Sequence, residues 1–166
     1  MASRMRNSAK AIIIEDGRIL VIGKRDPVFG DWYLLPGGGQ QFGETLHEAL
    51  RREVHEEASI AVEIGELLFI REYIGANHEF AREDGDLHQV EFMFRCRRNP
   101  ATDPANGHEP DTHQTRVEWM PVERLSEYPF FPKSLAPLLA RLEDSSRRAA
   151  EQGSPPLGPI YLGDTN

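Results

Sequence analysis

Apolar and polar positions along this chain follow two periods, a strand-like alternation in several short segments and a helical repeat in two longer ones. Residues 11–14 and 19–22 are apolar runs that flank the pair Asp16 and Gly17. An Asp-Gly pair between two apolar runs is a strong signal for a β-hairpin. A hairpin is therefore predicted over residues 11–22.

Alternation or β-rich composition predicts further strands. The clearest is residues 88–97, where one valine and two phenylalanines alternate with other side chains. The polar residues 74–87 and 99–114 are predicted to be loops. The remaining predicted strands are residues 32–35, residues 61–73 as one or two strands with a bend near Gly65, and residues 117–120.

Helical periodicity predicts two helices and one short turn. Residues 45–58 repeat apolar side chains every three or four positions, and residues 132–152 carry four leucines on one side. Residues 122–125 are predicted to form the helical turn. Strands, a helix, further strands and a second helix, in that order, indicate a mixed α+β domain.

The first of these helices carries Glu53, Glu56 and Glu57. Side chains three and four positions apart share a helix face, so the three carboxylates are expected to converge. At about 100° per residue, Glu53 and Glu57 fall in or beside the apolar stripe, not opposite it. Burial there is costly without compensating positive charge, and Arg52, four residues before Glu56, covers only part of the cost. A solvated charged face is the ordinary alternative, but this projection favours a site for Mg²⁺ or Mn²⁺.

A glycine-rich segment, residues 36–43, precedes this helix. Glycine permits positive φ and a close approach of the backbone to a ligand. A plain turn between a strand and a helix is one interpretation of the segment. Because the segment leads into a helix N-terminus, which carries partial positive charge, it also suits a phosphate group.

Residues 38–60 resemble the Nudix box, the signature of the Nudix hydrolases, which is written G-x5-E-x7-R-E-U-x-E-E-x-G-U. The match runs from Gly38 through Glu44 to the segment REVHEEASI at residues 52–60. The one departure is Ser59, which replaces the last glycine of the motif. That position follows the helix, where a left-handed cap is common, so serine is expected to cost about 1 kcal/mol at most.

The resemblance implies a fold, a reaction and a set of metal ligands. The fold is a Nudix-like α/β/α sandwich around a mixed β-sheet, with one domain over residues 1–152 and a Pro/Gly-rich tail at residues 153–166. The reaction is hydrolysis of a phosphoanhydride in which a nucleoside diphosphate is linked to another moiety. The implied ligands of Mg²⁺ or Mn²⁺ are Glu53, Glu56, Glu57 and the backbone carbonyl of Gly37.

The resemblance also implies catalytic and structural roles. Arg52 is expected to orient the glutamates and forms the catalytic set with Glu53 and Glu57. Glu44 and Gly38 are expected to be structural. The family has no fixed general base, so Glu53 and acidic residues on later loops are both candidates.

Candidate substrate-binding residues lie outside this motif. Trp32 is expected either to stack on a base or sugar or to lie in the core. Arg71 is a candidate for holding outer phosphates, and Glu91 is a candidate for a further metal ligand or a base. The expected partner is therefore a small phosphorylated metabolite or nucleotide substrate.

Composition further restricts the classes of partner that are expected. The net charge of −8 and the pI near 5.3 disfavour non-specific nucleic-acid binding, which depends on Lys and Arg. No apolar run has transmembrane length and residues 1–10 lack a signal-peptide pattern, so no membrane partner and a cytoplasmic location are expected. Cys96 is the only cysteine and is predicted to fill the core.

Two other functions are open on this fold. A non-catalytic Nudix-like sensor would bind a nucleotide without cleaving it, but it has no need for all three glutamates of the motif. An isomerase acting on a diphosphate substrate would need a reactive cysteine or a proton donor in its cleft. Cys96, in an apolar strand, is a poor candidate for that cysteine.

The tail combines a linker-like stretch at residues 154–159 with the apolar Ile160, Tyr161 and Leu162. It is expected either to fray or to dock. The docking site is its own domain or a partner subunit in a homodimer, with an added strand as one form of docking.

Overall fold

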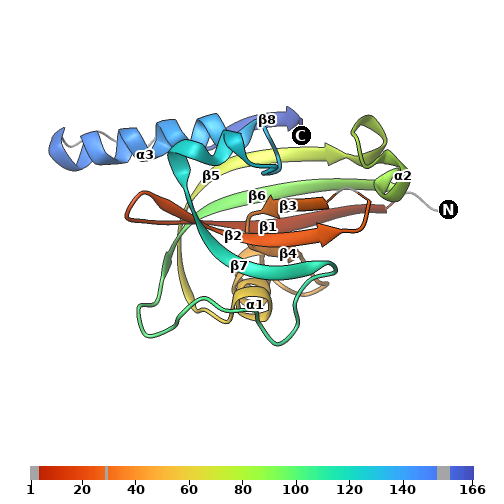
Figure 1. The fold of residues 1–166 in the computed structure, drawn as a ribbon, viewed down its shortest axis with the longest axis horizontal. Helices are drawn as coiled ribbons and strands as arrows, with labels where there is room; N and C mark the ends of the chain where they lie inside the picture. Colours follow the sequence, from red (N-terminus) through yellow and green to blue (C-terminus); the bar gives the residue numbers. More distant parts are fainter. Residues whose placement is uncertain (1–3, 29, 153–157) are drawn as a thin grey trace.

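The computed structural model describes residues 4–28, 30–152 and 158–166, and in these ranges a mixed β-sheet separates two helical layers (Figure 1). The helical elements are α1 (Leu46–Ala58), η1 (Gly75–Asn77), α2 (Ala81–Asp84), η2 (Val122–Glu127) and α3 (Leu135–Gln152). The strands are β1 (Arg4–Glu15), β2 (Arg18–Asp26), β3 (Gly30–Leu34), β4 (Gly37–Gly39), β5 (Val62–Ile74), β6 (Leu87–Arg98), β7 (Gln114–Pro121) and β8 (Ile160–Asp164).

Strand β1 joins the two halves of the sheet. The strand order is β3-β2-β1-β6-β5-β8, with β4 paired to β1 and β7 paired to β2. Residues 4–13 of β1 run parallel to β6, whereas only Ile14 and Glu15 pair with β2 at the predicted hairpin. Residues 8–10 pair with β4 on the other edge of β1. The glycine strand β4 is therefore fixed beside the centre of the sheet.

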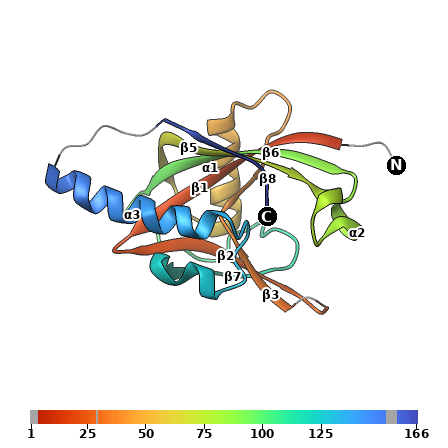
Figure 2. The same cartoon turned by 90° about the horizontal axis from the view of Figure 1, so that it is seen from above.

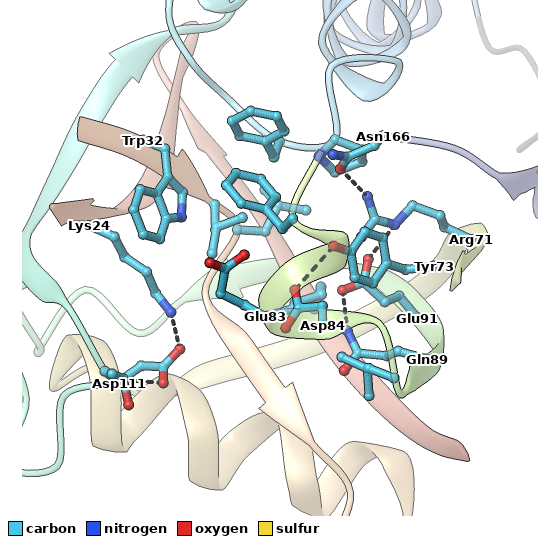
Figure 3. Close-up of a pocket in the computed structure, with 18 of the residues that line it drawn as sticks. Lys24, Trp32, Arg71, Tyr73, Glu83, Asp84, Gln89, Glu91, Asp111 and Asn166 are labelled. Atoms are coloured by element: carbon cyan, nitrogen blue, oxygen red, sulfur yellow. Dashed lines mark hydrogen bonds and ion pairs between the residues drawn. The ribbon is translucent and has the colours of Figure 1, made fainter. Parts of the chain in front are cut away.

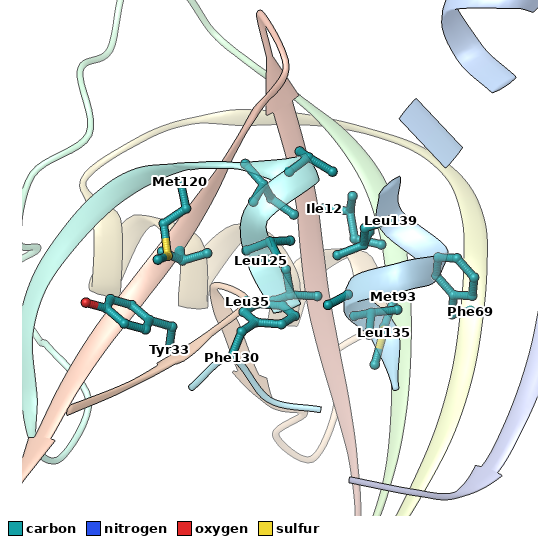
Figure 4. Packing of buried hydrophobic residues seen from close by; sticks show 14 of the residues in the cluster. Ile12, Tyr33, Leu35, Phe69, Met93, Met120, Leu125, Phe130, Leu135 and Leu139 are labelled. Atoms are coloured by element: carbon teal, nitrogen blue, oxygen red, sulfur yellow. The ribbon is translucent and has the colours of Figure 1, made fainter. Parts of the chain in front are cut away.

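Each face of the sheet carries its own apolar cluster. On one face, Leu50 and Val54 of α1 pack with alternate residues of β1 such as Ala11 and Ile13. On the other face, η2 and α3 cover the cluster shown in Figure 4, in which Leu139 packs with Ile12 and others. Figure 2 shows α3 lying across the strands. The expected α/β/α sandwich around a mixed sheet is confirmed, and no helix in the described ranges is long and apolar enough to cross a membrane.

Helix α1 begins and ends where its local sequence predicts. Thr45 is the N-cap, and the backbone N–H of Glu48 donates to its Oγ1 at 3.2 Å. The Glu48 carboxylate in turn accepts the backbone N–H of Thr45 at 2.7 Å, which completes a capping box. At the other end Ser59 has φ 59° and ψ 20°, the expected left-handed cap.

Three segments differ from the sequence prediction. Residues 74–87 are not only a loop, because they contain η1 and α2, whose few polar residues show no apolar period. The glycines of β4 form a strand although the segment was expected to be a loop, since they lack the side chains that give a strand pattern. Strand β1 begins at Arg4, well before the predicted start, and its polar first residues pair with β6.

The tail docks on its own domain as an added strand. Strand β8 runs parallel to β5, and Phe69 pairs with Ile160. Of the three apolar residues of the tail, Leu162 packs on the core, whereas Ile160 and Tyr161 are exposed. Most of the linker predicted at residues 154–159 lies outside the described residues.

Candidate active site

Glu57 is the most deeply buried of the three helix glutamates. Its place in the apolar stripe is confirmed, because the residue is only 3% exposed and lies on the same face as Leu50 and Val54. Its Oε2 accepts a hydrogen bond from the backbone N–H of Gly37 at 2.8 Å. Burial raises the pKa of Glu57 to about 7, although Lys10 and the Gly37 hydrogen bond act in the opposite direction.

Arg52 connects the other glutamates of the motif. Its Nε and Nη2 donate to the Glu44 carboxylate at 2.7 and 3.0 Å. Its Nη1 donates to Glu53 at 2.7 Å and to Glu56 at 3.2 Å. A further bond from Nη2 to the carbonyl of Gly39, at 3.0 Å, fixes the guanidinium against β4. This geometry supports the orienting role expected for Arg52.

Glycine is required at the two positions of β4 that face the glutamates. Gly37 has φ 122°, and a Cβ there would lie 2.2 Å from the carbonyl oxygen of Ala9. A Cβ on Gly38 would lie 2.4 Å from Oε2 of Glu53. At Gly37 the missing side chain lets β4 pack against β1, and at Gly38 it lets the backbone approach the Glu53 carboxylate.

The expected metal ligands all have protein partners in this structure, and the expected convergence of the three carboxylates is not observed among the described residues. No group of three His, Cys, Asp or Glu side chains in the described part of the chain is arranged to hold a metal ion. Glu53 and Glu56 pair with an arginine, Glu57 bonds to Gly37, and the Gly37 carbonyl accepts a hydrogen bond from Nζ of Lys10. These are hard oxygen donors, and the burial of Glu57 is a cost that a cation would offset. The residues therefore fit a divalent cation chemically, and their ligand roles stay a prediction.

A pocket of about 420 Å³ lies beside this site, between the two halves of the sheet (Figure 3). Strands from both halves, α2 and residues 111–113 line it. All three residues expected to bind substrate line the pocket, namely Trp32, Arg71 and Glu91. The pocket also contains Lys24, which adds positive charge.

Trp32 belongs to an aromatic wall of this pocket and not to the core. Its ring lies 6.1 Å from that of Phe80 and 6.3 Å from that of His113, measured between centroids. Phe80 in turn lies 5.6 Å from Phe131. Such a wall can contact a flat ring in a ligand through stacking or edge contacts.

Arg71 and Glu91 form the buried polar floor of the pocket. They are 6% and 5% exposed, and Nε of Arg71 lies 2.7 Å from Oε2 of Glu91 as an ion pair. Within the described residues this Nε makes no hydrogen bond, so its contact with Glu91 is electrostatic and its N–H does not point at the carboxylate. Gln89 donates to Oε1 of Glu91 at 2.7 Å and accepts from Nε of Arg6 at 2.5 Å.

Two residues that the sequence analysis missed connect the pocket to the glutamates. Lys10 lines the pocket and its Nζ donates to the carbonyl of Gly37. Asp111 lines the pocket, pairs with Lys24, and raises the pKa of Glu57 by its charge. Lys10 lies directly before the predicted strand at residues 11–14 and Asp111 lies in a polar loop, so neither residue had a signal in the sequence.

The Asp111 loop is anchored to the C-terminal end of α1. The backbone N–H of Gly107 donates to the carbonyl of Glu57 at 3.0 Å, and Nε2 of Gln114 donates to the same carbonyl at 2.8 Å. These bonds satisfy a carbonyl that the helix end leaves without a partner of its own. They also hold the loop that carries Asp111 at the edge of the pocket.

Fold and site together define a class, the small α/β/α domains in which a glutamate-rich helix faces a glycine strand beside a pocket lined by charged and aromatic side chains. The model of the NUDIX domain matches residues 5–142, and the chain belongs to this family. The resemblance of residues 38–60 to the Nudix box is thereby confirmed at the level of the family.

Named relatives agree with this assignment. The chain is 32% identical over 120 residues to a MutT-like protein of Streptomyces ambofaciens, covering 72% of this chain and 65% of that protein. It is 39% identical over 57 residues to an ADP-ribose pyrophosphatase of Methanocaldococcus jannaschii, covering 34% of each. The match therefore spans less than two thirds of the length of either relative.

A solved structure extends the comparison to the fold. The MutT NUDIX hydrolase from Burkholderia pseudomallei aligns with a TM-score of 0.63 and 26% identity. The alignment covers 84% of this chain and 98% of that one. The sheet and helix layers described above are therefore those of a NUDIX fold.

Proposed function

We propose that the chain is a metal-dependent NUDIX pyrophosphohydrolase that cleaves a phosphoanhydride in a nucleoside diphosphate linked to another moiety. The observation that carries the proposal is the position of Glu53 and Glu57. Both carboxylates lie against the glycine backbone of β4, next to Lys10. Lys10 lies at the edge of a pocket that is lined by basic side chains and an aromatic wall. The names of the MutT-like and ADP-ribose pyrophosphatase relatives support the same reaction class.

The pocket residues bind and orient the substrate. Lys10 and Lys24 offer positive charge to the diphosphate on the side of the pocket nearest the glutamates. Trp32 offers a ring face to a base or sugar. The chemistry that Mg²⁺ or Mn²⁺ supplies when held by the helix glutamates is neutralisation of the diphosphate charge and activation of water.

A carboxylate must accept the proton of the attacking water. Glu53 and Asp111 are the two candidates beside the diphosphate side of the pocket. Burial opposes ionisation of Asp111, but Lys24 keeps its pKa below the ordinary value, so the carboxylate is ionised near neutral pH. Comparing Glu53→Gln with Asp111→Asn therefore separates the two assignments.

The test is phosphate or nucleotide release from a panel of nucleoside diphosphate compounds, with and without Mg²⁺. We expect Glu53→Gln and Glu57→Gln each to lower kcat by at least about 100-fold without loss of the fold, which circular dichroism checks. Glu66→Gln is the matched control, because this carboxylate pairs with Arg95 on the surface. Near-normal rates in both helix variants at saturating metal would contradict the assignment, and nucleotide binding without release would indicate the sensor.

A further inference from the structure

The tail segment, residues 160–166, contributes directly to the pocket. Asn166 is one of the lining residues. Nη1 of Arg71 donates to the backbone carbonyl of Thr165 at 3.2 Å and reaches Oδ1 of Asn166 at 3.5 Å (Figure 3). The tail thus holds the guanidinium that, with Glu91, forms the floor of the pocket.

The tail segment also bonds to the chain around η1, which leads into α2 and another wall of the pocket. The carboxylate of Asp164 accepts the backbone N–H of Ile74 at 3.0 Å and Nδ2 of Asn77 at 2.7 Å, and it lies 2.6 Å from Nε2 of His78. These residues belong to η1 or lie next to it, and the chain then continues into α2. Glu83 and other residues of that region line the pocket.

Further bonds tie the same wall to the tail and to the start of the α3 region. Nδ2 of Asn166 donates to Oε2 of Glu79 at 3.1 Å, and Nζ of Lys133 donates to the other oxygen of Glu79 at 2.9 Å. Strand β8 pairs with β5, the strand that carries Arg71 and Tyr73 into the pocket. Removal of the tail would therefore release bonds on two sides of one end of the pocket.

We propose that the end of the tail segment, residues 164–166, forms the far wall of the substrate pocket and sets the size of the group accepted beyond the diphosphate. This rests on the proposed function. In Figure 3, Asp111 and Lys24 lie at one side of the pocket, and Arg71 and Asn166 lie at the opposite side. A pocket of about 420 Å³ is within the range that holds one compact ligand, and a second nucleoside would need the space that the tail fills.

The experiment compares a compact substrate, ADP-ribose, with a long one, diadenosine tetraphosphate. The intact chain is compared with a variant that lacks residues 160–166 and with the point variants Asp164→Ala and Asn166→Ala. We expect the ratio of kcat/KM for the long over the compact compound to rise about tenfold in the truncated chain. The point variants should shift the ratio in the same direction by a smaller factor.

Tyr161→Phe is the matched control. Tyr161 is in the same strand, but its hydroxyl donates to Glu72 away from the pocket, and the residue is 62% exposed. This variant should leave the ratio unchanged. If the truncated chain does not fold, the two point variants decide the question. A ratio within about twofold of that of the intact chain, in folded variants, would overturn the proposal.

A binding measurement separates this proposal from the proposed function. Failure of the intact chain to hydrolyse these two compounds and the rest of the panel would contradict the hydrolase assignment alone. Calorimetric titration with methylene-bridged, non-hydrolysable analogues of both compounds then tests the wall. A shift of about tenfold in the ratio of the two Kd values on truncation supports it, and an unchanged ratio overturns it.

Discussion

Replacing Glu44 by glutamine tests the charge network that organises the glutamate motif. The Glu44 carboxylate accepts two hydrogen bonds from Arg52 and one from the backbone N–H of Gln41 at 2.9 Å. Hydrogen bonding to Arg52 is the largest cause that lowers the pKa of Glu44 to about 2, and the Gln41 bond adds to it. Glu44→Gln keeps the size of the side chain and removes its charge, so it measures this interaction.

The pKa gives the size of the expected effect. The ordinary value is 4.5, and each pKa unit corresponds to about 1.4 kcal/mol, so the upper limit is roughly 3.5 kcal/mol. The Glu44 side chain is 20% exposed, and screening by solvent reduces the estimate to about 1–2 kcal/mol. Because the pKa is lower in the folded state, this stabilisation is present above the unfolded pKa and is lost as pH falls from 4.5 towards 2.

The assay is urea denaturation of the wild-type chain and of Glu44→Gln. At about pH 7 the variant should be about 1–2 kcal/mol less stable, and at about pH 3 less than half of that difference should remain. Glu66→Gln is the control, since its exposed ion pair with Arg95 should contribute under about 1 kcal/mol. Equal differences at both pH values, or none at neutral pH, would refute the reasoning.

Two further substitutions test the backbone around the site. Gly38→Ala places a methyl group 2.4 Å from Oε2 of Glu53, so kcat should fall about 100-fold. The control is Gly39→Ala, whose methyl group would lie 3.6 Å from the Arg6 guanidinium and should keep kcat within about threefold. Steady-state kinetics measures both variants, and equal losses of kcat would contradict the steric argument. Ser59→Gly removes a side chain at φ 59°, so the free energy of unfolding should rise by about 0.5–1 kcal/mol while turnover stays unchanged. Urea denaturation measures the change, and a loss of stability would show that serine is not strained there.

Helix α1 could be predicted from sequence because its determinants are local. The capping residue Thr45, the left-handed position of Ser59 and the pairing of Arg52 with Glu56 all depend on residues within one or two turns. The burial of Glu57 follows from the helical projection alone. The sequence therefore predicted both the helix and the side chains that it turns towards the sheet.

The pocket could not be assembled from sequence because its contacts are between distant segments. Lys24 pairs with Asp111, which lies in a polar loop with no periodicity. Trp32, Arg71 and Glu91 were candidates singly, but the pairing of Arg71 with Glu91 depends on the register between β5 and β6. The contribution of the tail depends on β8 pairing with β5, and an alternation pattern does not specify which strand is the neighbour.

The charges on α1 and on Glu44, which precedes it, divide the glutamates of the motif into two kinds. Glu44, Glu53 and Glu56 would repel one another, and a single guanidinium compensates all three. Within the described residues Glu57 forms no ion pair with an arginine, and it is also the most buried of the four, so its charge must be compensated by other positive groups. In this structure Lys10 supplies part of that positive charge, since it lowers the pKa of Glu57 and bonds to the Gly37 carbonyl beside it. A buried carboxylate whose ionisation is opposed by burial therefore lies where the pocket, the glycine strand and the glutamate helix meet.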